Sequence, residues 1–468
     1  MAFARFWART RARFSVAPIP IRFSFRMLSR NAAGDSIEMM SASFLWRGGK
    51  KIVLRRLRWV AMADSIERRA CPGVLKWCPG SRFPRAPISA KLRRADTFTT
   101  GDHMRVTAAV LYDVNKAYSV ETVELDPPKR GEVLIKVGAA GVCRSDLHFQ
   151  KGEATIALPA VLGHEGAGTV QAVGEGVTMT KPGDRVILSF VPNCGHCHSC
   201  ESGRPHLCDE HARTTGKLYD NTSRLHTEAG QDCAHMGKVA CFAEYAVVPE
   251  MGCVPAPASL DFPQLALIGC SVTTGVGAAV FNARVQPGDS VAVIGCGGVG
   301  LNVLQGARLA GATTIVAVDV KDTALAFAKK FGATDTVNAR TENAVARVQA
   351  LTGGGAHFAF EAYGSGATTR MAVDMLRKRG TAVIVGIAPA GDTAAIEPVV
   401  LTRGEKTLTG TYYGSAHPRQ DMPRIADWVE RGRLDVASLV TRRYALADIN
   451  RAYEDIDTDA VGRGVIVF

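Results

Sequence analysis

The sequence predicts an α/β protein in which a doubly wound parallel sheet follows a mostly-β unit. Short β-branched runs separated by turn residues recur between residues 105 and 190, and strands and helices alternate from residue 285 onward. A glycine-rich turn joins the first strand and the first helix of the alternating part. Alternation of this kind is typical of a parallel sheet that is covered by helices on both faces.

The mostly-β unit begins with irregular strands over residues 105–143. The same texture continues through "GHEGAGTVQAVGEGV" and "KPGDRVILSF", where glycine and proline mark the turns. We therefore expect an irregular all-β arrangement in this part of the chain.

The alternating part opens with a buried strand, "SVAVI", and a helix, "LNVLQGARLAGA". A second strand, "TIVAVDV", and a second helix, "DTALAFAKKFGA", follow. Later strands are expected at "HFAFEAYG", "TAVIVGIA" and "TLTGTYY", with a helix over residues 367–380. The last fifty residues add helices and a closing strand, "GRGVIVF".

Charge is unevenly distributed along the 468 residues. Residues 1–103 carry 17 Arg and 4 Lys against 6 acidic residues, a net charge of +15, whereas residues 104–468 carry 35 basic and 38 acidic residues, a net charge of −3. The overall charge of +12 thus comes from the N-terminal fifth, and we expect no nucleic-acid partner. No apolar run reaches the ~18 residues of a membrane helix, so we also expect no membrane association.

Residues 1–103 form a basic extension without sustained helical or strand periodicity. Three interpretations are open: a mitochondrial transit peptide, because residues 1–30 hold seven Arg and no acidic residue; a basic arm that touches membrane or nucleic acid; or translation from a start placed too early, with Met104 the true beginning. The compositional break at Met104 favours the last, and we expect the extension to be disordered or mis-assigned.

Gly295, Gly297 and Gly300 form a G-x-G-x-x-G motif between a strand and a helix. The glycines permit a tight turn and close approach to a pyrophosphate, and the helix offers free N–H groups to the phosphates. Asp319 follows nineteen residues after Gly300, at the end of the next strand. A carboxylate there can accept hydrogen bonds from the ribose hydroxyls and repels a 2′-phosphate, so the motif predicts NAD rather than NADP.

A second motif packs cysteines with C-x2-C-x2-C-x7-C spacing into one loop, at Cys194, Cys197, Cys200 and Cys208. Four thiolates complete the tetrahedron that zinc prefers, so this spacing predicts a closed, structural zinc site. A four-cysteine iron–sulfur cluster is the alternative. Disulfides are disfavoured because evenly spaced cysteines on a tight loop are difficult to pair.

Further chemistry-bearing residues are scattered along the chain. "GVCRSDLH" contains Cys143, Ser145, Asp146 and His148, "GHEGAG" contains His164 and Glu165, and "LIGCSVTTG" contains Cys270. Each residue alone is compatible with a packed core position. Together with the two motifs, however, they make the chain from Met104 to Phe468 resemble the zinc-dependent medium-chain alcohol dehydrogenases, in particular the long-loop, liver-type and class III-like members.

The resemblance implies a catalytic zinc ion held by Cys143, His164 and Cys270, with the fourth position left for water or substrate oxygen. It also implies that Asp146 orients His164 and that Glu165 sits behind the metal.

The remaining implied roles concern the proton and the cofactor. Ser145 would take the proton of the substrate and pass it through the cofactor ribose towards His148. Cofactor contacts beyond the glycine motif and Asp319 would come from Arg144 and Arg463 at the pyrophosphate, Thr274 at the nicotinamide, and Val299 within the motif. Phe190 would line the substrate pocket.

By the same resemblance, the fold is a Rossmann doubly wound domain plus a GroES-like, mostly-β catalytic domain. We expect the catalytic domain to span residues 104–271, where both zinc sites lie, and to resume over residues 414–468. The NAD-binding domain would span residues 272–413.

The expected function is NAD-linked, reversible hydride transfer between an alcohol or aldehyde held at zinc and the cofactor. A thiol-dependent formaldehyde dehydrogenase is the alternative, although Ala212 stands where members that oxidise glutathione adducts carry an arginine. A third hypothesis is a non-catalytic NAD(H)-binding protein. We expect two zinc ions per subunit, a cytoplasmic location, and a homo-oligomer, either dimer or tetramer.

Overall fold

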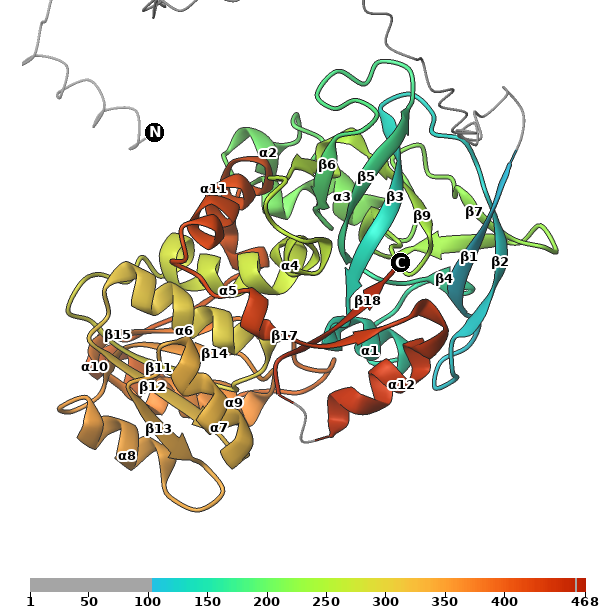
Figure 1. Ribbon diagram of the computed structural model, residues 1–468. Helices are drawn as coiled ribbons and strands as arrows, with labels where there is room; N and C mark the ends of the chain where they lie inside the picture. Colours follow the sequence, from blue (N-terminus) through green and yellow to red (C-terminus); the bar gives the residue numbers. More distant parts are fainter. Residues whose placement is uncertain (1–102, 459–460) are drawn as a thin grey trace, which may run out of the picture. The chain divides into compact units, whose positions relative to one another are not determined.

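A computed structural model describes residues 103–458 and 461–468 (Figure 1). The expectations for the basic extension, apart from His103, lie outside the described residues. The described part contains a closed five-stranded barrel, a seven-stranded sheet and a six-stranded sheet. The α/β fold class with a mostly-β domain is confirmed.

The barrel and the seven-stranded sheet form the mostly-β part. The barrel has the order β1-β2-β7-β8-β4. Its strands are β1 (Met104–Leu111), β2 (Ser119–Leu125), β7 (Leu225–Thr227), β8 (Asp232–His235) and β4 (Ala160–Val161). The seven-stranded sheet has the order β10-β6-β5-β3-β18-β17, and β9 also pairs with β3. Its strands are β10 (Cys253–Pro255), β6 (Arg185–Leu188), β5 (Glu165–Val173), β3 (Glu132–Gly141), β18 (Arg463–Val467), β17 (Val440–Tyr444) and β9 (Tyr245–Pro249).

Strands from the two ends of the described chain meet in the seven-stranded sheet. β18 is antiparallel to β3, with Val465 opposite Gly141 (Figure 1). The chain therefore enters the mostly-β part, leaves it for the six-stranded sheet, and returns. This return brings Arg463 beside residues that precede it by about three hundred positions.

The six-stranded sheet is entirely parallel, with the order β13-β12-β11-β14-β15-β16. Its strands are β11 (Ser290–Ile294), β12 (Thr314–Asp319), β13 (Asp335–Asn338), β14 (Ala356–Glu361), β15 (Leu376–Ile384) and β16 (Thr407–Gly410). The chain runs outward from β11 to β13 and then crosses back to β14. In such a sheet a ligand crevice lies at the carboxyl ends of the two strands where the direction reverses, here β11 and β14.

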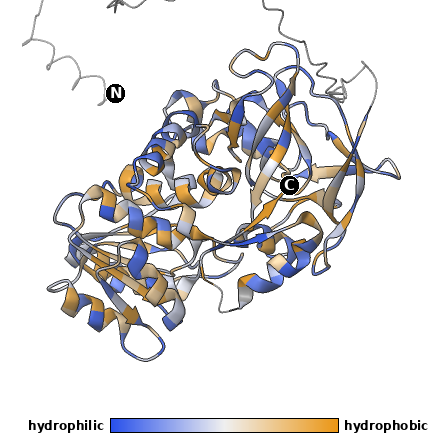
Figure 2. Cartoon of the chain, viewed as in Figure 1, coloured by the Kyte–Doolittle hydropathy of each residue, from blue (hydrophilic) through white to orange (hydrophobic). Residues whose placement is uncertain are grey.

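Alternating side chains of the sheet strands enter two different cores. Val291 and Val293 pack with Leu304 of α6 (Gly298–Ala310), whereas Ala292 and Ile294 pack with Val348 of α8 (Ala344–Leu351). The same division places α7 (Asp322–Ala328) on the first face and α9 (Gly366–Asp374) on the second. Figure 2 shows hydrophobic residues along these strands. Both faces are covered, as a parallel sheet requires.

One continuous helical segment, Phe262–Asn282, connects the two parts of the fold. It comprises α4 (Phe262–Leu267), a π-helical turn (Ile268–Val272), α5 (Thr273–Gly277) and a second π-helical turn (Ala278–Asn282). Within the described residues it is the one helix long and apolar enough to cross a membrane, and 78% of its most apolar stretch is buried inside the protein. That burial fits a core helix.

The remaining helices are short or cover the sheets from outside. They are α1 (Arg144–Gln150), α2 (His198–Glu201), α3 (Asp209–Arg213), α10 (Pro398–Gly404), α11 (Pro418–Glu430) and α12 (Ile449–Glu454).

The helix expected over residues 367–380 is shorter than predicted, because α9 ends at Asp374 and β15 begins at Leu376. Leu376 pairs with Ala356 of β14, and Arg379 has a positive φ of 63° that a helix cannot contain. Pairing in the sheet thus overrides the helical spacing of these residues.

Candidate active site and metal sites

Residues from three distant segments of the chain converge at the start of β5. The Sγ atoms of Cys143 and Cys270, a ring nitrogen of His164 and a carboxylate oxygen of Glu165 all lie within 4.8 Å of one another, and all four residues are buried. Cys143 directly precedes α1, and His164 directly precedes β5, of which Glu165 is the first residue. Cys270 lies in the first π-helical turn of the connecting helix. π-Turns inside helices frequently occur at functional sites.

Asp146 supports the imidazole of this cluster. Its Oδ1 is 3.1 Å from His164 Nδ1 and accepts a hydrogen bond of 3.0 Å from the Gly163 N–H. With Nδ1 directed at the carboxylate, Nε2 is the nitrogen left to bind a metal ion. Burial alone would lower the pKa of His164, but the nearby Asp146 carboxylate and Cys143 sulfur raise it above its ordinary value.

Glu165 is fixed behind the cluster by an arginine from β18. Arg463 Nη2 donates to Glu165 Oε2 at 2.7 Å and to the Val142 carbonyl at 2.8 Å. Burial raises the pKa of Glu165 to about 7, even though Arg463 opposes this shift. A Cβ atom at Gly298 would lie 2.4 Å from Arg463 Cδ, so this arginine contacts both the cluster and the glycine motif.

The donor set of this cluster fits a zinc ion. Thiolate and imidazole are the ligands zinc prefers, and three protein ligands leave one position for a reacting oxygen. A hydrogen bond from Cys270 lowers the pKa of Cys143 well below its ordinary value, which favours the thiolate that binds metal. Glu165 Oε1 is buried without a hydrogen-bond partner, as expected for a group that faces a cation.

The four-cysteine loop forms a separate cluster. The thiol groups of Cys194, Cys197, Cys200 and Cys208 lie within 4.8 Å of one another. Backbone N–H groups of Cys194, Cys197 and Asp209 donate to cluster sulfurs at 3.3 to 3.4 Å, an arrangement that stabilises thiolates. All cysteines within the described residues are free, so no disulfide competes with metal at this loop.

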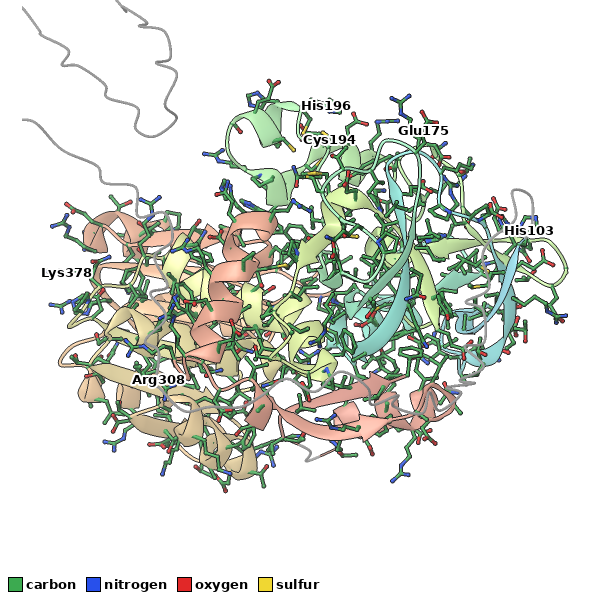
Figure 3. The ribbon with its side chains drawn as sticks, turned by 45° about the horizontal axis from the view of Figure 1, so that its top comes forward. His103, Glu175, Cys194, His196, Arg308 and Lys378 are labelled. Atoms are coloured by element: carbon green, nitrogen blue, oxygen red, sulfur yellow. The ribbon has the colours of Figure 1, made fainter. Side chains whose placement is uncertain are left out.

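His196 and His198, which lie between the cysteines of this loop, are not placed as metal ligands. His196 Nδ1 lies 3.0 Å from the Cys194 carbonyl, and both His196 and His198 are exposed. Figure 3 shows Cys194 and His196 on the same lobe. The donor set is therefore four sulfurs, which fits a closed structural zinc site with no position for a substrate.

The glycine motif lies where the reversal in strand order predicts a crevice. Gly295 has a φ of 92°, and a Cβ at Gly300 would lie 1.8 Å from the Gly295 carbonyl, so neither position accepts a side chain without a shift of the backbone. α6 starts directly after Gly297. Asp319 Oδ2 accepts a hydrogen bond of 2.7 Å from the Cys296 N–H, which holds the carboxylate beside the motif.

One cavity of about 1050 Å³ joins the dispersed cluster to the glycine motif. The predicted site residues that line it are Cys143, Arg144, Ser145, His148, His164, Phe190, Cys208, Cys270, Thr274, Gly295, Gly297, Val299, Asp319 and Arg463. The cavity lining does not include Gly300, Asp146 or Glu165, all of which are buried. The metal donors and the dinucleotide motif thus face the same space.

Two predicted proton-handling groups lie near the cluster on α1. Ser145 Oγ is 3.7 Å from Cys143 Sγ, and His148 lies three residues further along the helix. The His148 ring also contacts the Glu153 carboxylate through Nδ1, a partner that the sequence analysis missed. Glu153 lies in the loop after α1, and its spacing from His148 carries no helical or strand signal.

Aromatic residues around Phe190 were also missed. Its ring centroid is 5.3 Å from His164, 4.0 Å from Tyr413 and 6.1 Å from Tyr412. Tyr363, which follows β14, lines the same cavity and is 63% exposed. The tyrosines stand at strand ends, and only the order of strands in the sheet reveals that they face the cavity.

Comparisons with known proteins agree with this geometry. A family model described as an alcohol dehydrogenase GroES-like domain matches residues 129–258, and one described as a zinc-binding dehydrogenase matches residues 298–431. The chain is 38% identical to an S-(hydroxymethyl)glutathione dehydrogenase of Saccharomyces cerevisiae over 76% of this chain and 95% of that enzyme. It is 39% identical to an NDMA-dependent alcohol dehydrogenase of Amycolatopsis methanolica over 78% of this chain and 99% of that enzyme. The structure of benzyl alcohol dehydrogenase from Acinetobacter calcoaceticus matches with a TM-score of 0.74 and 32% identity, over 78% of this chain and 99% of that one.

Proposed function

Because the chain belongs to the zinc-dependent medium-chain alcohol dehydrogenases, and is an NAD-linked oxidoreductase acting on CH–OH groups, we propose that its substrates are primary alcohols with an apolar, aromatic or medium-chain body, together with their aldehydes. The observation that carries this proposal is the shared cavity, in which the metal donors and the cofactor motif face an aromatic wall.

The wall around Phe190 favours an uncharged substrate. Tyr412 lies beside Phe190, and a Cβ atom at Gly237 would lie 2.9 Å from Phe190 Cβ, so these residues form one surface. Besides His148 and His164, two further histidines line the cavity; burial lowers the pKa of His206 and lowers that of His211 to about 3. Both are therefore neutral near pH 7, and an apolar alcohol body is the chemistry that fits.

We propose the following roles for the residues around the reacting carbon. When bound, zinc supplies a Lewis acid for the substrate oxygen and NAD supplies the hydride acceptor. Ser145 Oγ accepts the proton that leaves the substrate hydroxyl and at the same time releases its own hydroxyl proton in the direction of His148, which the Glu153 carboxylate holds. Asp146 keeps His164 in the tautomer that binds metal, and Arg463 holds Glu165 in place while contacting the glycine motif.

Oxidation of a thiol–formaldehyde adduct is a second candidate function, which the relatives named S-(hydroxymethyl)glutathione dehydrogenase support. Glutathione carries carboxylates, which a binding site usually holds with cationic side chains. Ala212 lines the cavity without a charge, and the neighbouring Arg213 donates to Glu210 at 3.0 Å and lies outside the cavity lining. These contacts favour the free alcohol.

The test is a substrate panel with NAD and with NADP as cofactor. We expect kcat/KM to be highest for benzyl-type or medium-chain primary alcohols, and NAD to be used in preference to NADP. Formaldehyde with glutathione serves as the competing substrate. A kcat/KM for the adduct that exceeds that for every free alcohol by tenfold or more would replace the leading proposal with the second.

We also propose that the protein forms a homo-oligomer. β16 is an edge strand of the six-stranded sheet, and Leu408 on it is exposed. An unpaired edge strand with an exposed apolar side chain is a template for pairing with another chain. Size-exclusion chromatography with light scattering tests this, and a monomer at micromolar concentration would contradict it.

A further inference from the structure

Lys238 is a buried cation that the proposed reaction does not use. Its residue is 1% exposed, and its backbone has a φ of 57°, directly after Gly237 with a φ of 59°. A non-glycine residue in the left-handed region carries backbone strain, and burial of a charge adds a further free-energy cost. Contacts of the side chain must therefore offset both.

Those contacts all come from one short segment, residues 214–219. Lys238 Nζ donates to the Thr214 carbonyl and to Thr214 Oγ1, both at 2.6 Å, and to the Lys217 carbonyl at 2.7 Å. The three hydrogens of the ammonium group are thus all used. The Tyr219 ring lies 5.0 Å from Nζ, close enough for a cation–π contact.

The tethered segment and the residues before Lys238 both contribute to the lining of the same cavity. Met236 and Gly237 line it, and Gly237 packs against Phe190. Ala212 and Thr215 line it as well, and they flank Thr214, which Lys238 holds. Lys238 therefore connects the loop that follows the four-cysteine cluster to the wall that carries Phe190.

We propose that Lys238 is a positioning residue that holds residues 214–219 against the Phe190 wall and thereby determines which alcohols fit the cavity. This inference rests on the proposed function, since it assumes that alcohols enter this cavity. Lys238 itself does not touch the reacting atoms. Its loss leaves the Thr214 and Lys217 carbonyls without their buried donor, so the segment shifts towards water.

The consequence should differ between small and large alcohols. Ethanol needs only the space beside the metal donors, whereas the larger benzyl alcohol also needs the space between Phe190 and the tethered segment. In Lys238→Met we therefore expect KM for benzyl alcohol to rise about tenfold, while kcat and KM for ethanol stay within about twofold, because pocket contacts contribute factors of this size. Lys217→Met is the matched control, because it removes a lysine from the same segment and keeps the carbonyl that Lys238 binds.

A double-mutant cycle makes the test independent of turnover. Thr214→Val removes the hydroxyl that Lys238 binds, and Thr214→Ser retains it. If Lys238 acts through Thr214, the loss of thermal stability in Lys238→Met combined with Thr214→Val is smaller than the sum of the two single losses. Thr214→Val should also raise KM for benzyl alcohol, in the same direction as Lys238→Met, and this holds as a test should Lys238→Met fail to fold.

Three results would overturn the inference: additive stability losses, equal changes in KM for both alcohols, or a similar effect in Lys217→Met. A wild-type enzyme that oxidises no free alcohol would refute the proposed function instead, and the stability cycle would still decide whether Lys238 tethers the segment.

Discussion

The two cysteine clusters of this protein differ in how the chain builds them. The four-cysteine cluster uses ligands that lie within fifteen consecutive residues, on a loop whose members are mostly half-exposed. The dispersed cluster uses Cys143, His164 and Cys270, which span 127 positions and are all buried. The first is a property of one loop, whereas the second exists only when β5, α1 and the connecting helix are packed together.

This difference indicates that the four-cysteine cluster contributes to stability and the dispersed cluster to the reaction. Four sulfurs close the shell of a metal ion and leave nothing for a substrate, so the local cluster can only hold its loop in shape. The dispersed cluster has an imidazole oriented by Asp146, a carboxylate held by Arg463, and an open side that faces the cofactor motif. Substitutions in the dispersed cluster should therefore lower turnover, whereas substitutions in the four-cysteine cluster should lower stability.

The largest expected effect comes from Cys143→Ala in the dispersed cluster. We expect kcat to fall by about a thousandfold or more, because a Lewis acid contributes several kcal/mol of transition-state stabilisation. Metal analysis should show one zinc ion lost per chain, and NADH binding followed by fluorescence should change by less than about threefold. Unchanged turnover would contradict the assignment of the dispersed cluster as the catalytic site.

Cys200→Ser in the local cluster should mainly lower stability. We expect the melting temperature to fall by about 5 °C, since loss of a structural metal removes binding free energy that contributes to folding. Limited proteolysis should then cut within residues 194–213, while kcat of the folded fraction stays within a few fold. A loss of kcat as large as that of Cys143→Ala, in protein that remains folded, would break the distinction between the clusters.

Asp146→Asn tests whether support of a ligand matters in the dispersed cluster. The amide keeps the shape but loses the charge that raises the pKa of His164 and fixes its tautomer. We expect zinc affinity, measured by competition with a chelator, to fall by about 10- to 100-fold. Equal zinc retention in the variant and the wild type would show that the carboxylate does not orient the ligand.

His235 is a buried imidazole that, unlike His164, has no carboxylate partner among the residues that the structure describes, so the two histidines should respond differently to acid. His235 accepts a hydrogen bond from the Arg224 N–H at 3.1 Å, and burial lowers its pKa to about 3. The unfolded chain takes up this proton first as the pH falls below about 6.5, so stability decreases from pH 6.5 towards pH 3. We expect the free energy of unfolding of the wild type to fall by about 2 kcal/mol between pH 7 and pH 5 because of this residue. The free energy of unfolding of His235→Gln should fall by less, and urea unfolding at the two pH values measures both. Parallel losses in both proteins would contradict this assignment.

The parts of the molecule that the sequence predicts well are those whose information is local. The glycine motif, Asp319 and the four cysteines are recognisable because spacing alone defines them, and the resemblance to a family links Cys143, His164 and Cys270. Glu153, Tyr412 and Lys238 were missed because their contacts depend on how distant segments pack. The prediction that the helix extends to residue 380 was wrong for the same reason: α9 ends at Asp374 because the residues that follow pair with β14, and this pairing outweighs their helical spacing. The roles of Ser145 and His148, the domain boundaries and the cytoplasmic location remain predictions.

The helix Phe262–Asn282 carries both Cys270 and Thr274, which are four residues apart and therefore lie on the same side of the helix, one turn apart. The spacing between a predicted zinc ligand and the threonine predicted to contact the nicotinamide is therefore set within one helix and does not depend on how the two parts of the fold pack. Any shift of one part of the fold against the other would move Cys270 and Thr274 together.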